Sequence, residues 1–443
     1  MTPEEIANYM KKELVKKGAD DVLVSVGRDN TTLIKFANNK ISVTKSWDTV
    51  DLGVFLAKDK KIVSTSIKDF SMKTADETIT LLMKFVKSAR PNTEYEGIAE
   101  GPFKYKDIEE TYDPKIIDLN EKSIDFVEQG INTALDIGAK RTAGILEFSH
   151  FDAYLITSNN VEAADKGTSL YYSIRALVDK YASGHIVTVS RVLNKFKPEA
   201  TAQEAAEIAK DALNPQQCEE GSYDVVFHPF AFANLLMNLG SNFSVFNIES
   251  GLSCLQNTLG KKIMNDQVSM YDDGTLKNGF GSSRFDAEGV PTQRTTLVDK
   301  GVIKSYLHNT STAKRYKTHT TGNAGLIVPE PNNVILKSGD FSKDELFSNI
   351  KKGIYITNVW YTRFQNSQTG DFSTIPRDGA FYIENGKIKY PVKNFRVSEN
   401  LLEIMRKISA LGKEGVQIKG WEVESPVVTP YVLVNKVTIT KPL

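Results

Sequence analysis

Two spacings of apolar residues alternate along the first 215 residues of the chain. One recurs every three to four positions, as in residues 3–17, where Ile6, Met10 and Leu14 fall on one face of a helix. In the other pattern, apolar residues recur at every second position between turn-forming residues, as is typical of strands. The helical pattern predicts helices over residues 3–17, 71–88, 114–137 and 201–214. The strand pattern predicts strands within 21–28, 31–67, 141–160 and 168–193.

Long helices that alternate with strand pairs predict an α+β protein whose N-terminal domain, residues 1–215, is of α/β type. The polar segment NPQQCEEGSYD, at 214–224, contains Pro and Gly and is the predicted boundary. Beyond it, strands dominate, separated by Gly- and Asn-containing hairpin turns such as DKGV and ENGK. Residues 220–443 are therefore predicted to form a mainly antiparallel, barrel-like β domain.

Two helices are predicted to interrupt this second half, at 343–352 and at 399–411. The second has Ser398 as its expected N-cap and Gly412 as its stop signal. Its buried stripe is expected to contain Leu401, Ile404, Met405, Ile408 and Leu411.

Composition and charge indicate which partners and which cellular compartment to expect. The 443 residues carry no net charge, which favours neither nucleic acid nor an anionic membrane as a partner. Two cysteines, Cys218 and Cys254, cannot crosslink a chain of this length, so we expect a reducing compartment. The uncharged stretch 225–248 is too rich in Asn, Ser, His and Pro for a membrane span. The sequence predicts a cytoplasmic protein without direct membrane contact.

Common catalytic and metal-binding motifs do not emerge from the chain. None of the five histidines is followed by Glu, so the helical zinc-protease motif is absent. His308 and His319 are interpreted as incidental surface residues, and His228 as a packing or capping residue before Pro229. LQNTLGKK departs from a P-loop at two positions, NGFGSSR follows a turn, and no G-x-S-x-G elbow exists.

The remaining candidate groups have structural explanations. Cys254 is expected to pack in apolar surroundings, because a reactive thiol needs a nearby base or helix N-terminus. Two acidic pairs each precede a glycine, and turn chemistry explains them better than acid–base work. These pairs are Asp272 with Asp273, and Asp286 with Glu288.

One loop stands out. Gln365–Thr374, QNSQTGDFST, is polar, has Asp371 as its only charged residue, and lies between two predicted strands. It is either a solvated hairpin loop or the rim of a site for a peptide or a partner. Its rim candidates are Gln368, Thr369, Gly370, Asp371 and Ser373.

The chain resembles the TldD/PmbA family, whose members are described as metallopeptidase subunits and as candidate modulators of DNA gyrase. The matching segments follow one another in the family's order along nearly the whole chain. Each segment alone is moderately specific, but together they make a strong resemblance. In the second half it rests on residues 272–325, GIYIT at 353, TGDFS at 369 and GAFYIENGKIKYPVKNF at 379. In the first half IKFANNKI and YASGHIVTVSRVL match.

The resemblance implies a zinc peptidase in the TldD branch, with H-E-x-x-x-H in a helix after two leucines and a cysteine in a late glycine-rich loop. Here the leucines are Leu235 and Leu236, and no cysteine follows Cys254. The six motif positions hold Met237, Asn238, Leu239, Gly240, Ser241 and Asn242. Both imidazoles and the general base are missing, although Gly240 would permit a bend that the family motif needs.

TGDFS is typical of the PmbA branch, also called TldE, which lacks the metal motif. The resemblance then implies a subunit with no catalytic or metal-binding residue of its own and no cofactor, zinc being expected in a TldD-type partner. A heterodimer with that partner, or a homodimer, would act on unfolded peptides.

Two other hypotheses stay open. The chain could be a self-sufficient hydrolase whose site is unrecognised. It could also be a peptide-binding or regulatory module, as the gyrase-modulator description implies.

Overall fold

The computed structural model describes residues 1–348 and 350–441. It combines 24% helix with 42% strand, which confirms the predicted α+β class. No helix within these ranges is both long and apolar enough to cross a membrane.

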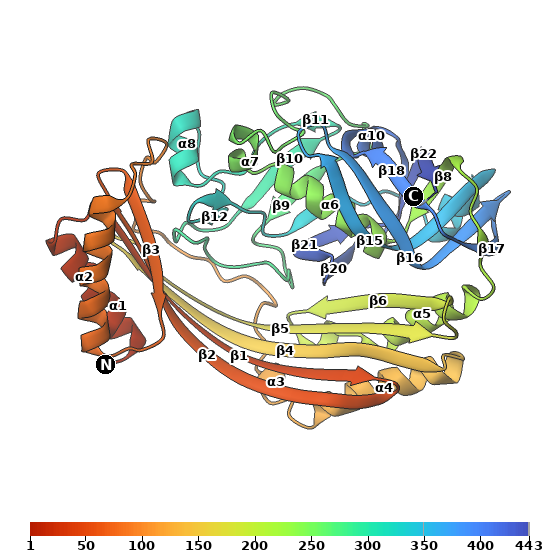
Figure 1. The fold of residues 1–443 in the computed structure, drawn as a ribbon, viewed down its shortest axis with the longest axis horizontal. Coiled ribbons are helices and arrows are strands. Elements are labelled where there is room, and N and C mark those ends of the chain that lie inside the picture. Colours follow the sequence, from red (N-terminus) through yellow and green to blue (C-terminus); the bar gives the residue numbers. More distant parts are fainter. Residues whose placement is uncertain (349, 442–443) are drawn as a thin grey trace.

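The first half is built on a six-stranded antiparallel sheet with the order β3-β2-β1-β4-β5-β6. Its strands are β1 (Asp21–Ala37), β2 (Lys40–Lys58), β3 (Lys61–Ile67), β4 (Arg141–Thr157), β5 (Glu162–Leu177) and β6 (Ser183–Ser190). The ANNK and AKDKK segments form the expected tight turns, because Asn38, Asn39, Asp59 and Lys60 adopt the left-handed conformation that such turns require. Strands of this length give a long, curved sheet (Figure 1).

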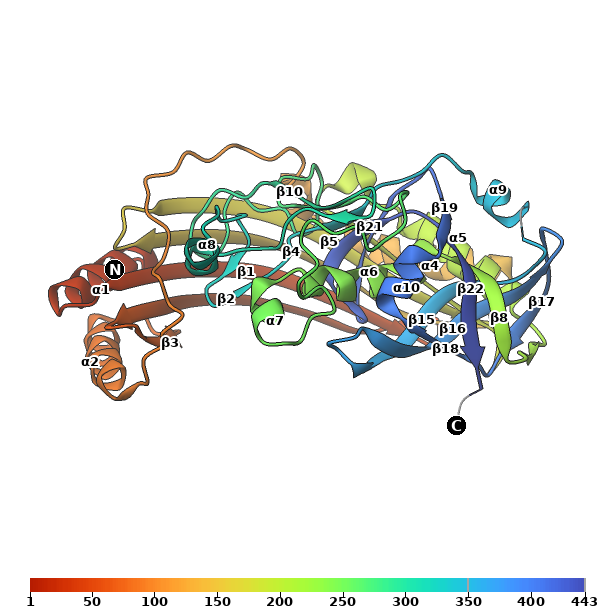
Figure 2. The same ribbon diagram turned by 90° about the horizontal axis from the view of Figure 1, so that it is seen from above.

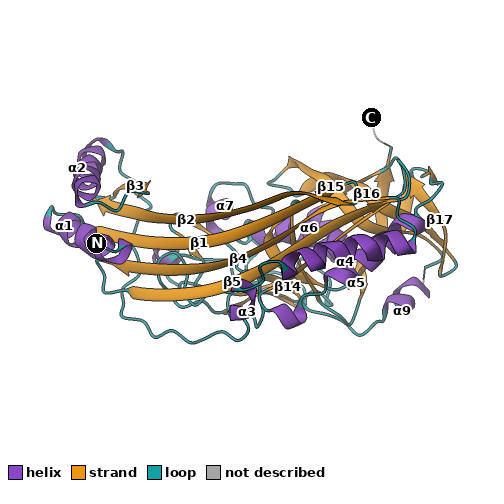
Figure 3. Cartoon of the chain, turned by 90° about the horizontal axis from the view of Figure 1, so that it is seen from below, coloured by secondary structure: helices purple, strands orange, loops and turns teal. Residues whose placement is uncertain are grey.

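Helices cover the two ends of this sheet (Figure 3). At one end lie α1 (Pro3–Lys16) and α2 (Met72–Ser88), and at the other α4 (Lys122–Ile137) and α5 (Pro198–Asp211). The predicted single helix at 114–137 is wrong. It is divided into α3 (Pro114–Ile117) and α4, because Asn120 takes a φ of 40°, which no right-handed helix accommodates.

The second half contains a closed barrel of five strands, as the barrel-like prediction required. It closes because β15 pairs with β8 on one side and with β16 on the other. The barrel strands are β8 (Gly221–Phe227), β15 (Lys352–Asn366), β16 (Asp371–Glu384), β18 (Arg396–Asn400) and β22 (Val432–Thr440). Shorter strands extend it, namely β7 (Gln216–Gln217), β17 (Lys387–Lys393) and β19 (Ile408–Leu411).

A second sheet of the C-terminal half has the order β11-β10-β9-β14-β21-β20. Its strands are β9 (Met270–Asp273), β10 (Arg294–Asp299), β11 (Val302–Ile303), β14 (Val334–Leu336), β20 (Val416–Gly420) and β21 (Val423–Thr429). A hairpin of β12 (Ala324–Gly325) and β13 (Val328–Pro329) lies apart from it. The helices of this half are α6 (Pro229–Asn242), α7 (Val245–Glu249), α8 (Thr310–Tyr316), α9 (Lys343–Ser348) and α10 (Leu401–Arg406). In the first half, a 3-10 turn (Leu193–Lys195) precedes α5.

The predicted helix at 399–411 is also wrong in extent. Asn400, not Ser398, caps the six-residue helix α10, since its side chain accepts the N–H groups of Leu402 and Glu403. Ile408 and Leu411 are buried as expected, but on strand β19, which pairs with β22. The helix predicted at 343–352 gives way to strand β15 at Lys352.

The C-terminal half lies over one face of the long sheet, and the α1–α2 end projects beyond it (Figures 1 and 2). The two halves share core packing. One apolar cluster contains Phe36 and Ile174 of the first sheet together with Phe381 and Leu433 of the barrel. Their relative placement is therefore stabilised by apolar burial.

Candidate functional site

Helix α6 is the element on which the family resemblance places a metal site. It begins where Pro229 occupies its first turn and His228 caps it, the Nδ1 atom accepting the N–H of Phe230 at 3.0 Å. This confirms the capping role predicted for His228, whose Nε2 atom lies 3.0 Å from Glu204. The helix is apolar nearly all round and is buried between the barrel strands and the second sheet.

Gly240 does not bend this helix. Helix α6 continues unbroken to Asn242, and Gly240 instead brings it close to strand β14. A Cβ atom at Gly240 would lie 2.5 Å from Cγ2 of Val334. The glycine is therefore explained by close packing.

The polar side chains of the six motif positions are hydrogen-bonded to their own helix. The Nδ2 atom of Asn238 donates to the carbonyl oxygen of Asn234 at 2.8 Å, and Ser241 Oγ donates to that of Met237 at 3.2 Å. Asn242 Nδ2 donates to the carbonyl oxygen of Asn238 at 2.8 Å. Each bond ties a side chain to the residue one turn earlier, so these groups are satisfied without a ligand.

Asn242 also connects helix α6 to Cys254. Its Oδ1 atom accepts the N–H of Cys254 at 2.9 Å, and its carbonyl oxygen accepts the Ser253 hydroxyl at 2.7 Å. Cys254 is buried in the apolar core, and burial raises the pKa of its thiol to about 11. The free thiol is therefore protonated at neutral pH, which suits packing in the apolar core and not nucleophilic chemistry.

The residues around α6 do not fit a zinc ion. A zinc site takes thiolate, imidazole or carboxylate ligands in tetrahedral geometry. Here the donor set is a thioether, two amides already hydrogen-bonded, and a protonated thiol. In residues 1–348 and 350–441, no cluster of three or more His, Cys, Asp or Glu side chains has metal-binding geometry.

The segment Gln365–Thr374 lies beside the same cysteine. Its predicted extent as a loop is wrong, because β15 continues to Asn366 and β16 begins at Asp371, so only residues 367–370 form the turn. Gly370, in the left-handed region with a φ of 85°, packs so closely that a Cβ atom there would be 3.2 Å from Cβ of Cys254. The loop and the motif positions of α6, far apart in sequence, are thus brought together through Cys254.

The rim candidates divide by exposure. Gln368, Thr369 and Asp371 lie on the surface, whereas Gly370 and Ser373 are buried. Asn400 Nδ2 donates to Asp371 Oδ1 at 2.9 Å and the Thr369 hydroxyl donates to Oδ2; these bonds lower the pKa of Asp371. Ser373 Oγ accepts from Arg396 Nε at 2.6 Å. The loop is fixed by its own hydrogen bonds and by the cap of α10.

The family domain described as "PmbA/TldA metallopeptidase C-terminal domain" matches residues 220–441. Its "domain 1" matches residues 22–84. The chain belongs to the TldD/PmbA family.

Relatives of known sequence agree with this membership. An uncharacterized protein of Methanocaldococcus jannaschii is 29% identical over 340 residues, 75% of this chain and 77% of that protein. A Buchnera aphidicola protein named metalloprotease PmbA homolog is 27% identical over 226 residues, 51% of this chain and 49% of that protein. The chain thus spans about half the length of the curated metalloprotease relatives that it matches.

Solved structures share the fold along the whole chain. TldE of Thermococcus kodakarensis superposes with a TM-score of 0.86 at 20% identity, covering 99% of each chain. A Thermotoga maritima protein described as a candidate modulator of a DNA gyrase gives a TM-score of 0.88 at 23% identity, covering 99% of this chain and 100% of that one. At such identities the likeness establishes the fold of this TldD/PmbA family member.

A groove of about 650 Å³ separates the long sheet from the β20–β21 hairpin. Its sheet side presents hydroxyls of Thr31, Ser149, Ser169 and Ser173, and its far side presents Phe280, Lys419 and Trp421. Trp421, at the hairpin tip, is 83% exposed. The hairpin is held against α6, because Asn234 Nδ2 donates to the carbonyl oxygen of Glu422 at 2.7 Å. The same hairpin therefore borders the groove and contacts the metal-motif helix.

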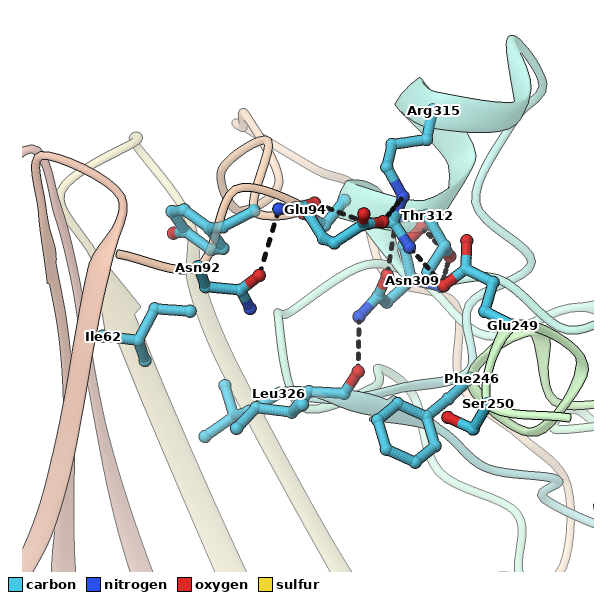
Figure 4. A pocket seen from close by; sticks show the side chains of 13 residues that line it. Ile62, Asn92, Glu94, Phe246, Glu249, Ser250, Asn309, Thr312, Arg315 and Leu326 are labelled. Atoms are coloured by element: carbon cyan, nitrogen blue, oxygen red, sulfur yellow. Dashed lines mark hydrogen bonds and ion pairs between the residues drawn. The ribbon is translucent and has the colours of Figure 1, made fainter. Parts of the chain in front are cut away.

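A second cavity of about 500 Å³ lies between α7, α8 and the 92–95 segment of the first half (Figure 4). Arg315 is bracketed there by Glu94 and Glu249, and Asn309 Nδ2 donates to the carbonyl oxygen of Ile327 at 3.2 Å. Because Arg315 already forms ion pairs with both carboxylates, we interpret this cavity as part of the contact between the two halves.

Two expectations about titratable residues need correction. His308 is buried, not on the surface, and burial lowers its pKa to about 4. Asp286 does stabilise a turn, because its Oδ1 atom accepts the N–H groups of Glu288 and Val290. Asp272 has a different role from the predicted turn residue: it is buried and accepts hydrogen bonds from Asn323, Asn332 and Asn333.

Burial raises the pKa of these carboxyl groups. The pKa of Asp272 rises to about 7 and that of Asp286 to about 6, while burial and the Asp286 charge raise that of Glu288 to about 8. Sequence reasoning missed this cluster. The available signal was the Asn-rich TTGNAG…PNN segment, which supplies the amides that hold Asp272.

Proposed function

We propose that this chain is the PmbA/TldE-type subunit of a two-subunit TldD/TldE peptidase. It has no zinc site, and a metal-bearing TldD-type partner supplies the catalytic centre. Family membership supports the peptidase context, and one observation carries the proposal. The six motif positions of α6 hold no imidazole or carboxylate, and their polar side chains are hydrogen-bonded within the helix.

The partner is a TldD-type chain, with a homodimer of this chain as the alternative assembly. A stable interface buries roughly 1,000 Å² or more in total. The Gln365–Thr374 loop, with Gln368, Thr369 and Asp371 exposed, is the proposed contact rim for that partner or for the peptide. Its fixed conformation lowers the ordering cost of association.

The substrate is an extended, unfolded peptide held in the groove between the long sheet and the β20–β21 hairpin. Strand β20 is the last strand of its sheet, and Lys419 and Gly420 line the groove. An extended peptide beside such an edge is bound through its backbone more than through its side chains. Trp421 and Tyr171 supply aromatic surface for peptide side chains.

The cytoplasm is the proposed compartment. Both cysteines are free and buried, which is consistent with a reducing environment.

Reconstitution tests this proposal. Hydrolysis of an unstructured peptide is measured with the purified chain alone, with a TldD-type chain alone, and with both. We expect chelator-sensitive hydrolysis only in the mixture. Trp421→Ala should reduce that rate, whereas Phe85→Ala, which removes another exposed aromatic side chain, on α2, should leave it unchanged.

The other outcomes separate the rival hypotheses. Chelator-resistant hydrolysis by the isolated chain would identify a self-sufficient hydrolase. Peptide binding without cleavage, even with a TldD-type chain present, would favour a regulatory module.

A further inference from the structure

A strongly cationic pocket lies where the two halves of the chain meet. It has a volume of about 470 Å³ and is formed where the β5–β6 turn of the long sheet meets β16, β17 and the segment that leads into β18. Figure 1 shows the β5–β6 end of the sheet beneath β16 and β17. Its charged lining residues are Arg175, Lys180, Arg377, Asp378, Lys393 and Arg396. Five cations and one anion thus surround one small cavity in a chain whose net charge is zero.

The single carboxylate of the lining neutralises only one of these cations. Asp378 lies 3.0 Å from the guanidinium of Arg175 and is almost completely buried. It also accepts the Ser183 hydroxyl at 2.7 Å and Asn358 Nδ2 at 3.0 Å. This carboxylate already accepts from three donors, and its single negative charge offsets only one of the five cations.

Those four cations have no carboxylate partner within 4 Å among residues 1–348 and 350–441. Lys393 Nζ lies 4.0 Å from the centre of the Tyr181 ring and Lys180 Nζ lies 4.7 Å from it. Arg377 stacks on Trp360 at 5.0 Å, and Arg396 donates to the neutral hydroxyl of Ser373. Aromatic rings orient these cations without cancelling their charge. Asp179, whose charge interacts with that of Lys180, accepts the N–H groups of Tyr181 and Ala182.

Arg175 adds a further unused donor. Its Nε atom is buried and has no hydrogen-bond partner among the described residues. A buried guanidinium N–H without an acceptor is costly, so Arg175 is incompletely satisfied by the groups around it.

We propose that this pocket binds a small molecule that carries phosphate groups. Four unpaired cations call for a ligand with more than one negative charge, which a monocarboxylate such as a peptide C-terminus does not provide. The forked guanidiniums suit phosphate oxygens and the lysines act as point charges beside them. The volume is that of a small-molecule site. Tyr181, 57% exposed at the mouth, offers a ring on which a nucleobase can stack.

Calorimetric titration of the full-length chain tests the proposal. The probes are inorganic pyrophosphate, adenosine diphosphate, and one short peptide with a free or an amidated C-terminus. We expect about one pyrophosphate per chain. Arg377→Gln and Lys393→Gln should each weaken binding about tenfold or more, while Lys73→Gln on α2 should leave it unchanged. Circular dichroism of each variant establishes that it is folded.

Two phosphate sources are distinguished by the probes. Tighter binding of adenosine diphosphate, lost in Tyr181→Ala, assigns a nucleotide. Equal binding of both phosphates assigns the phosphate group alone. Absence of pyrophosphate binding, equal weakening in Lys73→Gln, or selective binding of the free peptide carboxylate would each overturn the proposal. The peptidase proposal does not depend on the result.

Discussion

Helix α6 and the loop-rich segment 272–333 beside it bury polar groups in opposite ways. The TldD branch of the family carries a metal motif at the place of α6, whereas the polar side chains at these positions here are neutral and bonded to their own helix. The acidic pairs of the segment 272–333 were expected to lie in turns, yet three of these carboxyl groups are buried and have raised pKa values. A raised carboxyl pKa therefore does not by itself identify a reacting centre. Asp272 is explained by the amides that it holds in place.

The largest expected effect comes from removing the carboxylate of Asp272. Asp272→Ala leaves the amide groups of Asn323, Asn332 and Asn333 buried without their acceptor. We expect a loss of about 3–5 kcal/mol in the free energy of unfolding, measured by urea denaturation. The matched control Asp299→Ala removes an exposed carboxylate and should change it by less than about 0.5 kcal/mol. A loss below about 1 kcal/mol for Asp272→Ala would show that this carboxylate does not organise the segment.

Gly240→Ala tests the packing of α6. Alanine favours a helix by about 1 kcal/mol, but its Cβ atom would lie 2.5 Å from Val334 Cγ2. We expect a net destabilisation of about 1–3 kcal/mol from overpacking. Adding Val334→Ala should make the double variant more stable than the sum of the single effects predicts. Additivity in this double-mutant cycle would rule out the contact as the cause.

Glu288→Gln tests the buried acids through pH. The pKa of Glu288 is about 8 in the folded chain and about 4.3 when unfolded, so the folded state holds the proton more tightly. The free energy of unfolding therefore falls as pH rises from about 4 to about 8. The variant should be more stable than the parent by at least about 1 kcal/mol at pH 8.5 and nearly equal to it at about pH 4. The control variant Glu403→Gln, on the exposed face of α10, should leave the free energy of unfolding unchanged at both pH values. A pH-independent difference for Glu288→Gln would contradict the assignment.

The smallest effect is expected when the metal motif is restored on α6. Met237→His, Asn238→Glu and Asn242→His together should give at most weak zinc binding and no peptidase activity. Helix α6 is unbroken, so positions 237 and 242 point about 140° apart at roughly 100° per residue. Cys254 nearby stays protonated. Robust, chelator-sensitive hydrolysis by this variant would mean that the chain already contains a complete catalytic chamber.

The sequence predicted much of the fold because local chemistry decided it. Asn38 and Asn39 specify a hairpin by their left-handed conformations, and His228 with Pro229 specifies the start of α6. Errors arose where tertiary pairing overrides helical spacing, as at Ile408 and Leu411, which fit a helix but pair with β22. The resemblance located the metal-motif positions on α6. The burial of Asp272 could not be predicted, because the amide groups that donate to it come from residues 51 to 61 positions away along the chain.

The central claim is that this chain contributes no metal site, and the zinc content of the purified full-length protein tests it most directly. Zinc is measured by mass spectrometry after gel filtration without chelator, with a TldD-type chain as the positive control. We predict far less than one zinc per chain here and about one in the control. About one tightly held zinc per molecule of this chain would contradict the account.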